Sequence, residues 1–152
     1  MQTITPFLWF DGKAEEAMHF YSSIFDNARI VNVTRAGDTV MSATFQLAGQ
    51  TFIALNGGPA PFAFSPAVSF LINCETQQEV DTLWAKLSDG GSDQQCGWLK
   101  DKYGLSWQVV PSVLGKLLSD KDAGKRTRVA TALRQMKKID IDALQRAYEQ
   151  TV

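Results

Sequence analysis

The chain has 152 residues, enough for one ordinary domain with a hydrophobic core. Its 45% hydrophobic and 20% charged residues are typical of a globular protein, and its formal net charge of −1 favours neither nucleic acid nor an anionic membrane. No apolar run approaches the roughly 20 residues of a membrane helix, and the N-terminus lacks a signal-peptide pattern. We expect a cytoplasmic protein with no nucleic-acid or membrane partner, and with Cys74 and Cys96 as reduced thiols.

The first half of the chain predicts a strand, a helix and three further strands. Residues 4–10 form an apolar run that Asp11-Gly12 ends. Apolar side chains at three- and four-residue spacings then predict a helix: Ala14, Ala17, Met18, Tyr21, Ile24 and Phe25. Hairpin-linked strands are expected at residues 28–34, 40–47 and 51–55.

The second half begins after a segment rich in glycine and proline, residues 57–65, which we interpret as a linker. Strands are expected at residues 67–73, 95–100 and 105–111, and a helix at 76–87 with Thr76 and Glu79 as a capping box. After residue 111, apolar spacings predict a short helix, a longer one beginning near Asp122, and a last one capped by Asp140.

The two halves resemble each other. Laying Phe7 on Phe70, an offset of 63 residues, superposes the two helical stripes, so that Ala17 falls on Val80 and Tyr21 on Trp84. We therefore predict two βαβββ modules, at about 1–56 and 66–111, with residues 112–152 as a helical appendage of the same domain. Paired modules would form a curved sheet with helices outside and a concave inner face, an α+β fold.

Several stretches together resemble the PhnB-like branch of the vicinal oxygen chelate superfamily, which includes glyoxalase I, extradiol dioxygenases and bleomycin-resistance proteins. They are ITPFLWFDGKAEEAMHFY, ALNGGP, VSFLINCETQQEVDTLW, CGWLKDKYGLSWQVVP and MKKIDIDAL. The resemblance implies that the two modules form a curved, open barrel-like sheet, commonly in a homodimer. The branch is also labelled demethylubiquinone methyltransferase-like, but residues 56–59, NGGP, fit a linker turn far better than the nucleotide-binding turn that a methyl donor needs.

Active members of the superfamily hold a divalent metal by one residue from the first and one from the last strand of each module. Carried over position by position, this quartet becomes Thr5, Ile53, Val68 and Gln108. Only Gln108 has a side chain of the ligating type, and the sole histidine, His19, lies in a helix pattern. We therefore expect no metal and no cofactor, while an unexpected metal site or unrecognised acid–base groups would make the protein an enzyme.

Strand periodicity places the remaining candidates on the concave face. Leu8, Phe10, Trp107 and Val109 are expected to pack beneath the helices. The predicted ligand-binding residues are Thr5, Phe7, Trp9, Asn56, Trp98, Ser106 and Gln108. Each has a structural alternative: Trp9 could fill a core, Asn56 could cap a turn, and Gln108 could satisfy backbone groups at a sheet edge.

The remaining chemical groups favour structural roles. Cys96 has no neighbouring histidine to activate it, and the basic residues between Lys125 and Lys138 fit a solvated helix face better than a nucleic-acid site. Asp101 and Gly104 are expected to form the turn between the last two strands. The sequence thus predicts a metal-free binding protein for an unidentified small molecule, or a homodimeric interaction module whose cleft is filled by its own side chains.

Overall fold

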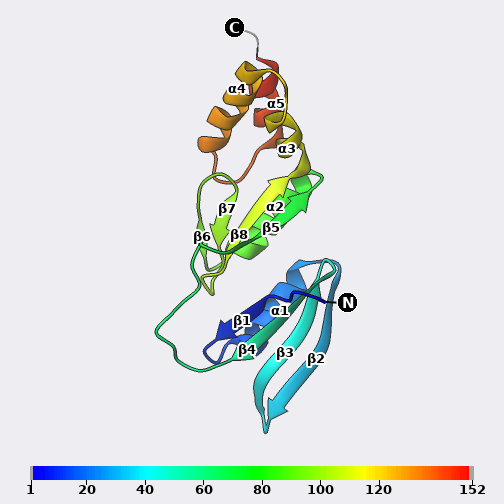
Figure 1. Cartoon of the computed structure of the whole chain (residues 1–152), viewed down its shortest axis with the longest axis vertical. Coiled ribbons are helices and arrows are strands. Elements are labelled where there is room, and N and C mark those ends of the chain that lie inside the picture. The colour runs from blue at the N-terminus through cyan, green and yellow to red at the C-terminus, as the bar shows by residue number, and fades with distance from the viewer. Residues whose placement is uncertain (1, 151–152) are drawn as a thin grey trace. The chain divides into compact units, whose positions relative to one another are not determined.

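A computed structural model describes residues 2–150. The chain divides into two compact units, Met1–Ala63 (unit 1) and Phe64–Val152 (unit 2), and the boundary falls inside the segment expected as a linker. Each unit contains a four-stranded sheet with one helix across one of its faces (Figure 1). Within the described residues, no helix is long and apolar enough to cross a membrane.

Unit 1 is a βαβββ module, as the sequence predicts. Its elements are β1 (Phe7–Phe10), α1 (Ala14–Ile24), β2 (Ala28–Ala36), β3 (Thr39–Leu47) and β4 (Gln50–Asn56). The strand order is β1-β4-β3-β2, with β1 parallel to β4 and the other neighbours antiparallel. The first strand is shorter than the expected residues 4–10, although the ladder continues to Pro6, whose carbonyl accepts from the amide of Ile53.

The core of unit 1 lies between α1 and the sheet. Leu8 and Phe10 of β1 are buried, as predicted, and alternate with exposed neighbours. The buried stripe of α1 meets them, and Tyr21 stacks on Phe45, which in turn stacks on Phe52. The period of two in the strands and the three- to four-residue spacing in the helix therefore bring their apolar sides together.

Unit 2 repeats this topology with shorter outer strands. Its elements are β5 (Ser69–Cys74), α2 (Gln77–Ser88), β6 (Ser92–Asp93), β7 (Trp98–Lys100) and β8 (Ser106–Pro111). The strand order β5-β8-β7-β6 matches that of unit 1, with β5 parallel to β8. The sequence did not predict β6, because two residues are too few to show a period.

The C-terminal appendage consists of α3 (Ser112–Leu118), α4 (Ala123–Arg134) and α5 (Ile141–Glu149). Asp140 caps α5 as predicted, and Asp122, near which a helix was expected to begin, caps α4. Thr76 caps α2 by accepting from the amide of Glu79. The three helices share a small apolar core whose buried members are Leu114, Leu117, Val129, Ile139 and Leu144. The apolar stripe of the tail is therefore used mainly within unit 2.

The pairing registers correct one detail of the repeat. Phe7 is the partner of Ile53 in unit 1, whereas Gln108, which corresponds to Ile53, pairs with Leu71. The strand equivalent of Phe7 is therefore Leu71 rather than Phe70, although the buried helical stripes do follow the expected offset. The difference arises because three residues separate β1 from α1, while two separate β5 from α2.

Candidate functional site

Each sheet has one face covered by its helix and one open face. On the open face of unit 1, Phe7 is 58% and Trp9 39% exposed, and on that of unit 2, Leu71 is 50% exposed. Trp107 and Val109 lie on the covered face of unit 2, at 2% and 0% exposed, as the strand period predicts. Exposed apolar side chains of this size make this face a candidate binding surface for a ligand or for another apolar surface.

Trp9 is fixed in place by the linker. Its indole Nε1 donates to the carbonyl of Gly58 at 2.9 Å, and the ring of Phe62 meets it edge-on with centroids 5.4 Å apart. Gly57 lies so close to the indole that a Cβ there would be 2.2 Å from Cε2. The NGG turn therefore holds Trp9, and only part of the indole remains exposed.

Asn56 has a structural role. Its Oδ1 accepts from the amide of Ala14 at the first turn of α1, and its Nδ2 donates to the carbonyl of Val40. Lys13, at the N-cap position of α1, makes no side-chain capping bond, so Asn56 supplies that function from the end of β4. We assign Asn56 to the capping alternative rather than to ligand binding.

Thr5 is half-buried and precedes β1, so the register gives it no ladder partner. It belongs to unit 1 together with Phe7 and Trp9, whereas Trp98, Ser106 and Gln108 belong to unit 2. The structure therefore brings the predicted residues together in two groups, one on each sheet.

In unit 2, three side chains form a row across the open face. Gln108 of β8 has Leu71 of β5 as its partner on one side and Trp98 of β7 on the other. Directly opposed residues on one sheet face lie close enough for their side chains to interact. A polar amide is therefore flanked by an exposed leucine and a half-buried tryptophan.

A second row lies one pleat away and contains Ser69, Ser106 and Lys100. Gln108 Nε2 donates to Ser69 Oγ at 2.9 Å, which joins the two rows. The register places Ser106 on the same face as Gln108, as expected, but its side chain is fully buried and its hydroxyl has no hydrogen-bond partner within residues 2–150. Sequence reasoning missed Ser69, and the shorter loop before α2 was the signal that could have found it.

The four positions that the sequence resemblance assigned to a metal do not fit one. Unit 1 supplies Thr5 and Ile53, and unit 2 supplies Gln108 and, by register, Ser69 in place of the expected Val68. None of these is an imidazole, carboxylate or thiolate, the groups that hold catalytic divalent metals. Among the described residues, no group of three or more His, Cys, Asp or Glu side chains is arranged to hold a metal ion.

Asp101 fixes the hairpin that carries this face. It is 3% exposed, and its carboxylate accepts from the amides of Tyr103 and Leu105 and from the indole Nε1 of Trp107, at 2.8, 3.1 and 2.9 Å. Gly104 N–H also donates to the Asp101 carbonyl, so the predicted turn is confirmed. The bond to Trp107, which sequence reasoning missed, ties the turn to the covered face.

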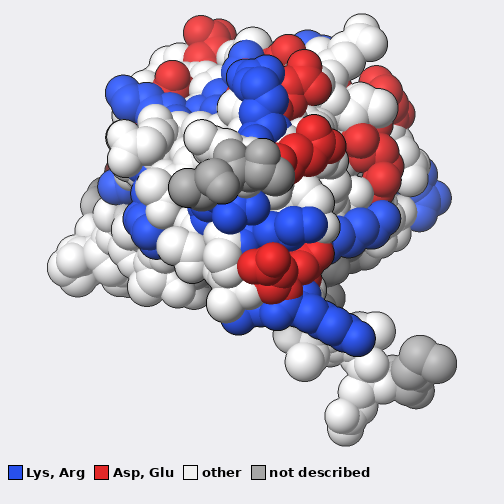
Figure 2. All heavy atoms as spheres, turned by 90° about the horizontal axis from the view of Figure 1, so that it is seen from above, with Lys and Arg blue, Asp and Glu red and all other residues white. Residues whose placement is uncertain are grey.

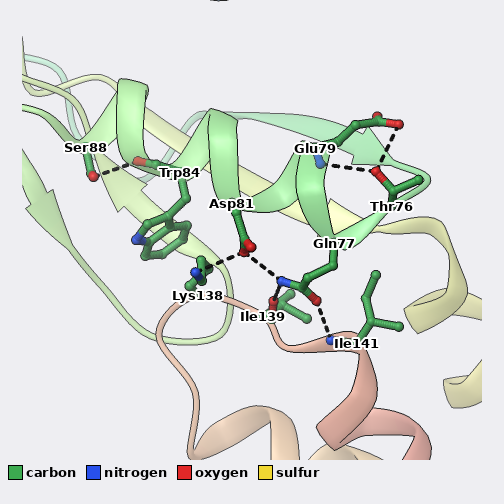
Figure 3. Close-up of polar contacts among 9 residues, drawn as sticks. All are labelled: Thr76, Gln77, Glu79, Asp81, Trp84, Ser88, Lys138, Ile139 and Ile141. Carbon is green, nitrogen blue, oxygen red and sulfur yellow. Dashed lines mark hydrogen bonds and ion pairs between the residues drawn. The ribbon is translucent and has the colours of Figure 1, made fainter.

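Residues 136–141, which we call the strap, hold the other end of the hairpin. The amides of Cys96 and Gly97 donate to the carbonyls of Met136 and Lys137, both at 2.8 Å. On α2, the Gln77 side chain donates to the carbonyl of Ile139 and accepts from the amide of Ile141 (Figure 3). The strap therefore bridges the start of α2 and the loop immediately before Trp98.

The basic residues of the tail are used within unit 2. Arg128 donates to the carbonyls of Ala147 and Tyr148 at the end of α5, and Lys138 pairs with Asp81 at 2.9 Å. The end of the molecule seen in Figure 2 carries both signs of charge interleaved. This arrangement does not form the positive stripe of a nucleic-acid site.

The two cysteines differ in environment. Cys74 is fully buried at the end of β5, and burial, followed by repulsion from Glu79 and Glu75, raises the pKa of its thiol to about 11. Cys96 is half-buried in the loop held by the strap. Cys74 is thus a packing residue without nucleophilic character at neutral pH.

Comparison with known proteins agrees with this fold. A family model described as 3-demethylubiquinone-9 3-methyltransferase matches residues 2–110. A solved protein from Bacillus cereus, described as a putative 3-demethylubiquinone-9 3-methyltransferase and PhnB protein, is 42% identical over 73% of this chain and 100% of its own, with a TM-score of 0.69. No curated protein matches the sequence significantly.

More distant structures share the fold alone. A protein from Pseudomonas aeruginosa is 22% identical over 73% of this chain and 98% of its own, with a TM-score of 0.64. The fosfomycin resistance protein FosX from Listeria monocytogenes, described as a complex with Mn(II) and sulfate, is 16% identical over 71% of this chain and 89% of its own, with a TM-score of 0.53. Together with the repeated βαβββ topology, the family match shows that this chain belongs to the PhnB-like 3-demethylubiquinone-9 3-methyltransferase family.

Proposed function

We propose that the protein binds a small apolar or aromatic molecule on the open faces of its sheets, without a metal. The observation that carries this proposal is the row of Leu71, Gln108 and Trp98, in which apolar surface flanks one polar group. Ligand sites in proteins commonly combine an apolar lining with a few placed hydrogen-bonding groups. The neutral side chains at the superfamily's metal positions support the metal-free part of the proposal.

The methyl transfer named in the family's description does not form part of this proposal. The NGG turn, residues 56–58, contains glycine and follows β4, which runs parallel to β1. Here the turn holds the indole of Trp9. A nucleotide-binding turn would instead present its backbone amides to a phosphate.

Native mass spectrometry of protein purified without chelators tests the proposal. We expect a co-purified or added organic molecule to remain bound, with no stoichiometric metal. Stoichiometric zinc, nickel, manganese or iron would contradict the metal-free reading and favour a metal-dependent enzyme. The same spectrum reports the homodimer that the superfamily resemblance implies.

A homodimeric interaction module is a second candidate, and the exposure of Phe7 and Leu71 favours it because a second copy could cover them. Phe7→Ser and Leu71→Ser variants separate the two functions. If these faces form an interface, the variants will be monomeric in analytical ultracentrifugation, whereas a ligand site alone predicts unchanged mass and weaker binding.

A further inference from the structure

We propose that the Ser69–Gln108 pair is a subsite for an uncharged group that both accepts and donates hydrogen bonds, such as a carboxamide on a flat aromatic molecule. This inference rests on the proposed function and names its ligand class. It uses unit 2 alone, because Ser69, Leu71, Trp98 and Gln108 all lie on one sheet.

The hydrogen-bonding capacity of the pair carries the argument. Gln108 Nε2 donates to Ser69 Oγ at 2.9 Å, and within residues 2–150 neither side chain makes another hydrogen bond. The Ser69 hydroxyl thus keeps its proton for donation and Gln108 Oε1 keeps its lone pairs. If the amide were turned over, the hydroxyl would donate and Nε2 would point away, which again leaves at least one donor and one acceptor. A ligand group with one acceptor and one donor can hydrogen-bond to both Ser69 and Gln108 in either orientation of the amide.

The surroundings of the pair define the rest of the ligand. Leu71 and Trp98 flank Gln108 in the same row, so a flat apolar body would lie across them. The neighbouring Ser106 hydroxyl is buried and unpaired within the described chain, which marks an unmet hydrogen bond beside Ser69. Lys100 lies at the far end of the row that contains Ser69 and Ser106, and its positive charge would favour a carboxylate over an uncharged group. The test must therefore distinguish a carboxylate ligand from a carboxamide ligand.

The test uses 2-naphthamide and 2-naphthoate, which share an aromatic body and differ in charge, titrated into the ¹⁵N-labelled full-length protein. We expect the amide to shift resonances of β5, β7 and β8 and to bind at least about five-fold more tightly than the carboxylate. Gln108→Leu and Ser69→Ala should each weaken amide binding about ten-fold. Gln108→Glu keeps the side-chain shape but removes the amide donor, and should weaken it similarly.

Gln78→Leu is the matched control, because Gln78 is exposed on α2 and the substitution is the same. It should leave the binding of both probes unchanged. Equal or tighter binding of naphthoate, or amide binding that Gln108→Glu does not affect, would overturn this inference and leave the proposed function standing. Absence of binding by both probes would also overturn it, and the proposed function would fail with it only if native mass spectrometry detected no organic ligand.

Discussion

Asp101 shows how a buried charge stabilises this fold. A carboxylate at 3% exposure loses most of its hydration, and three N–H donors from the turn and from Trp107 compensate. Such charge-assisted bonds are stronger than neutral ones. Asp101 thereby fixes both the turn and the indole that underlies β7 and β8.

Replacing this carboxylate should destabilise unit 2. Asp101→Asn presents an NH₂ group to N–H donors, so at least one donor loses its partner, and we expect a loss of about 1–3 kcal/mol in the free energy of unfolding. Urea unfolding followed by circular dichroism measures it. Asp93→Asn, on the exposed strand β6, is the control and should stay within about 0.5 kcal/mol of the wild type. Equal stability of both variants would contradict the role of Asp101.

The raised pKa of Cys74 predicts unequal labelling of the two thiols. A folded-state pKa of about 11, above the ordinary value of 9.0, keeps Cys74 protonated at pH 8, where the reactive thiolate is about 0.1% of the population. The folded protein should therefore react with one equivalent of iodoacetamide, at Cys96, and with two only after unfolding. Folding favours the thiol form of Cys74, so this group's contribution to the free energy of unfolding is fully present below pH about 9. That contribution should be lost as the pH rises from about 9 through about 11. Rapid labelling of Cys74 at pH 8, located by peptide mass mapping, would contradict the burial of this thiol.

Among the elements, the strap is the segment that joins the tail to the module. Apart from Ile141, the first residue of α5, it is neither helix nor strand, and its position depends on backbone bonds to Cys96 and Gly97 and on the side chain of Gln77. Gly97 is required here, since its φ of 85° is left-handed and a Cβ would be 2.7 Å from Ile139 Cδ1. The strap thus sets the loop that leads into Trp98.

Removing the Gln77 side chain should release the strap locally. Gln77→Ala breaks its bonds to Ile139 and Ile141, so amide hydrogen exchange should accelerate at residues 139–141 and, by extension, at residues 96–97. The adjacent exposed residue gives the control, Gln78→Ala, which should leave these rates unchanged. Unaltered exchange in Gln77→Ala would mean that the apolar core of the tail holds the strap unaided.

The linker turn offers a second test at this scale. Gly57→Ala places a methyl group within the indole of Trp9, so the turn or the ring must move. We expect lower stability and a shifted tryptophan emission. Trp9→Phe with Gly57→Ala should recover part of the loss, because the smaller ring vacates the space. No recovery would place the strain elsewhere in the turn.

At the scale of the molecule, the appendage is an addition to a module pair that related proteins form without it. The match to the B. cereus protein covers the whole of that chain and only 73% of this one, and the family match ends at residue 110. In this chain, however, the tail supplies a separate apolar core and the acceptors for two loop amides. The tail is therefore integrated into unit 2.

Deleting residues 112–152 should leave a folded but less stable protein. The amides of Cys96 and Gly97 would lose their acceptors, and the half-buried Val110 would lose the tail residues that pack on it. We expect a lower urea midpoint and faster exchange around Trp98, with α1 and β1 unaffected. An unchanged midpoint would contradict the integration of the tail.

The sequence alone determined most of the elements, the existence of the repeat and the buried faces of its strands and helices. Alternation in β1 and β8 and the stripes of α1 and α2 are local patterns, so they correctly place Leu8, Trp107 and Tyr21 in the cores. The caps Thr76, Asp122 and Asp140 were predictable for the same reason, since a cap bonds to amides two or three residues away.

Only the tertiary structure decided which residues meet across the chain. A difference of one residue in loop length decides whether Ser69 or Val68 stands at the position that the sequence resemblance assigns to a metal ligand. Strand pairing identifies Ser69, because a shift of one residue would place the side chain on the other face of the sheet. The bonds of Asn56 to Ala14, of Trp9 to Gly58 and of Gln77 to Ile141 join residues 42, 49 and 64 positions apart. No periodicity encodes such contacts, because they depend on how the elements pack rather than on their neighbours in sequence.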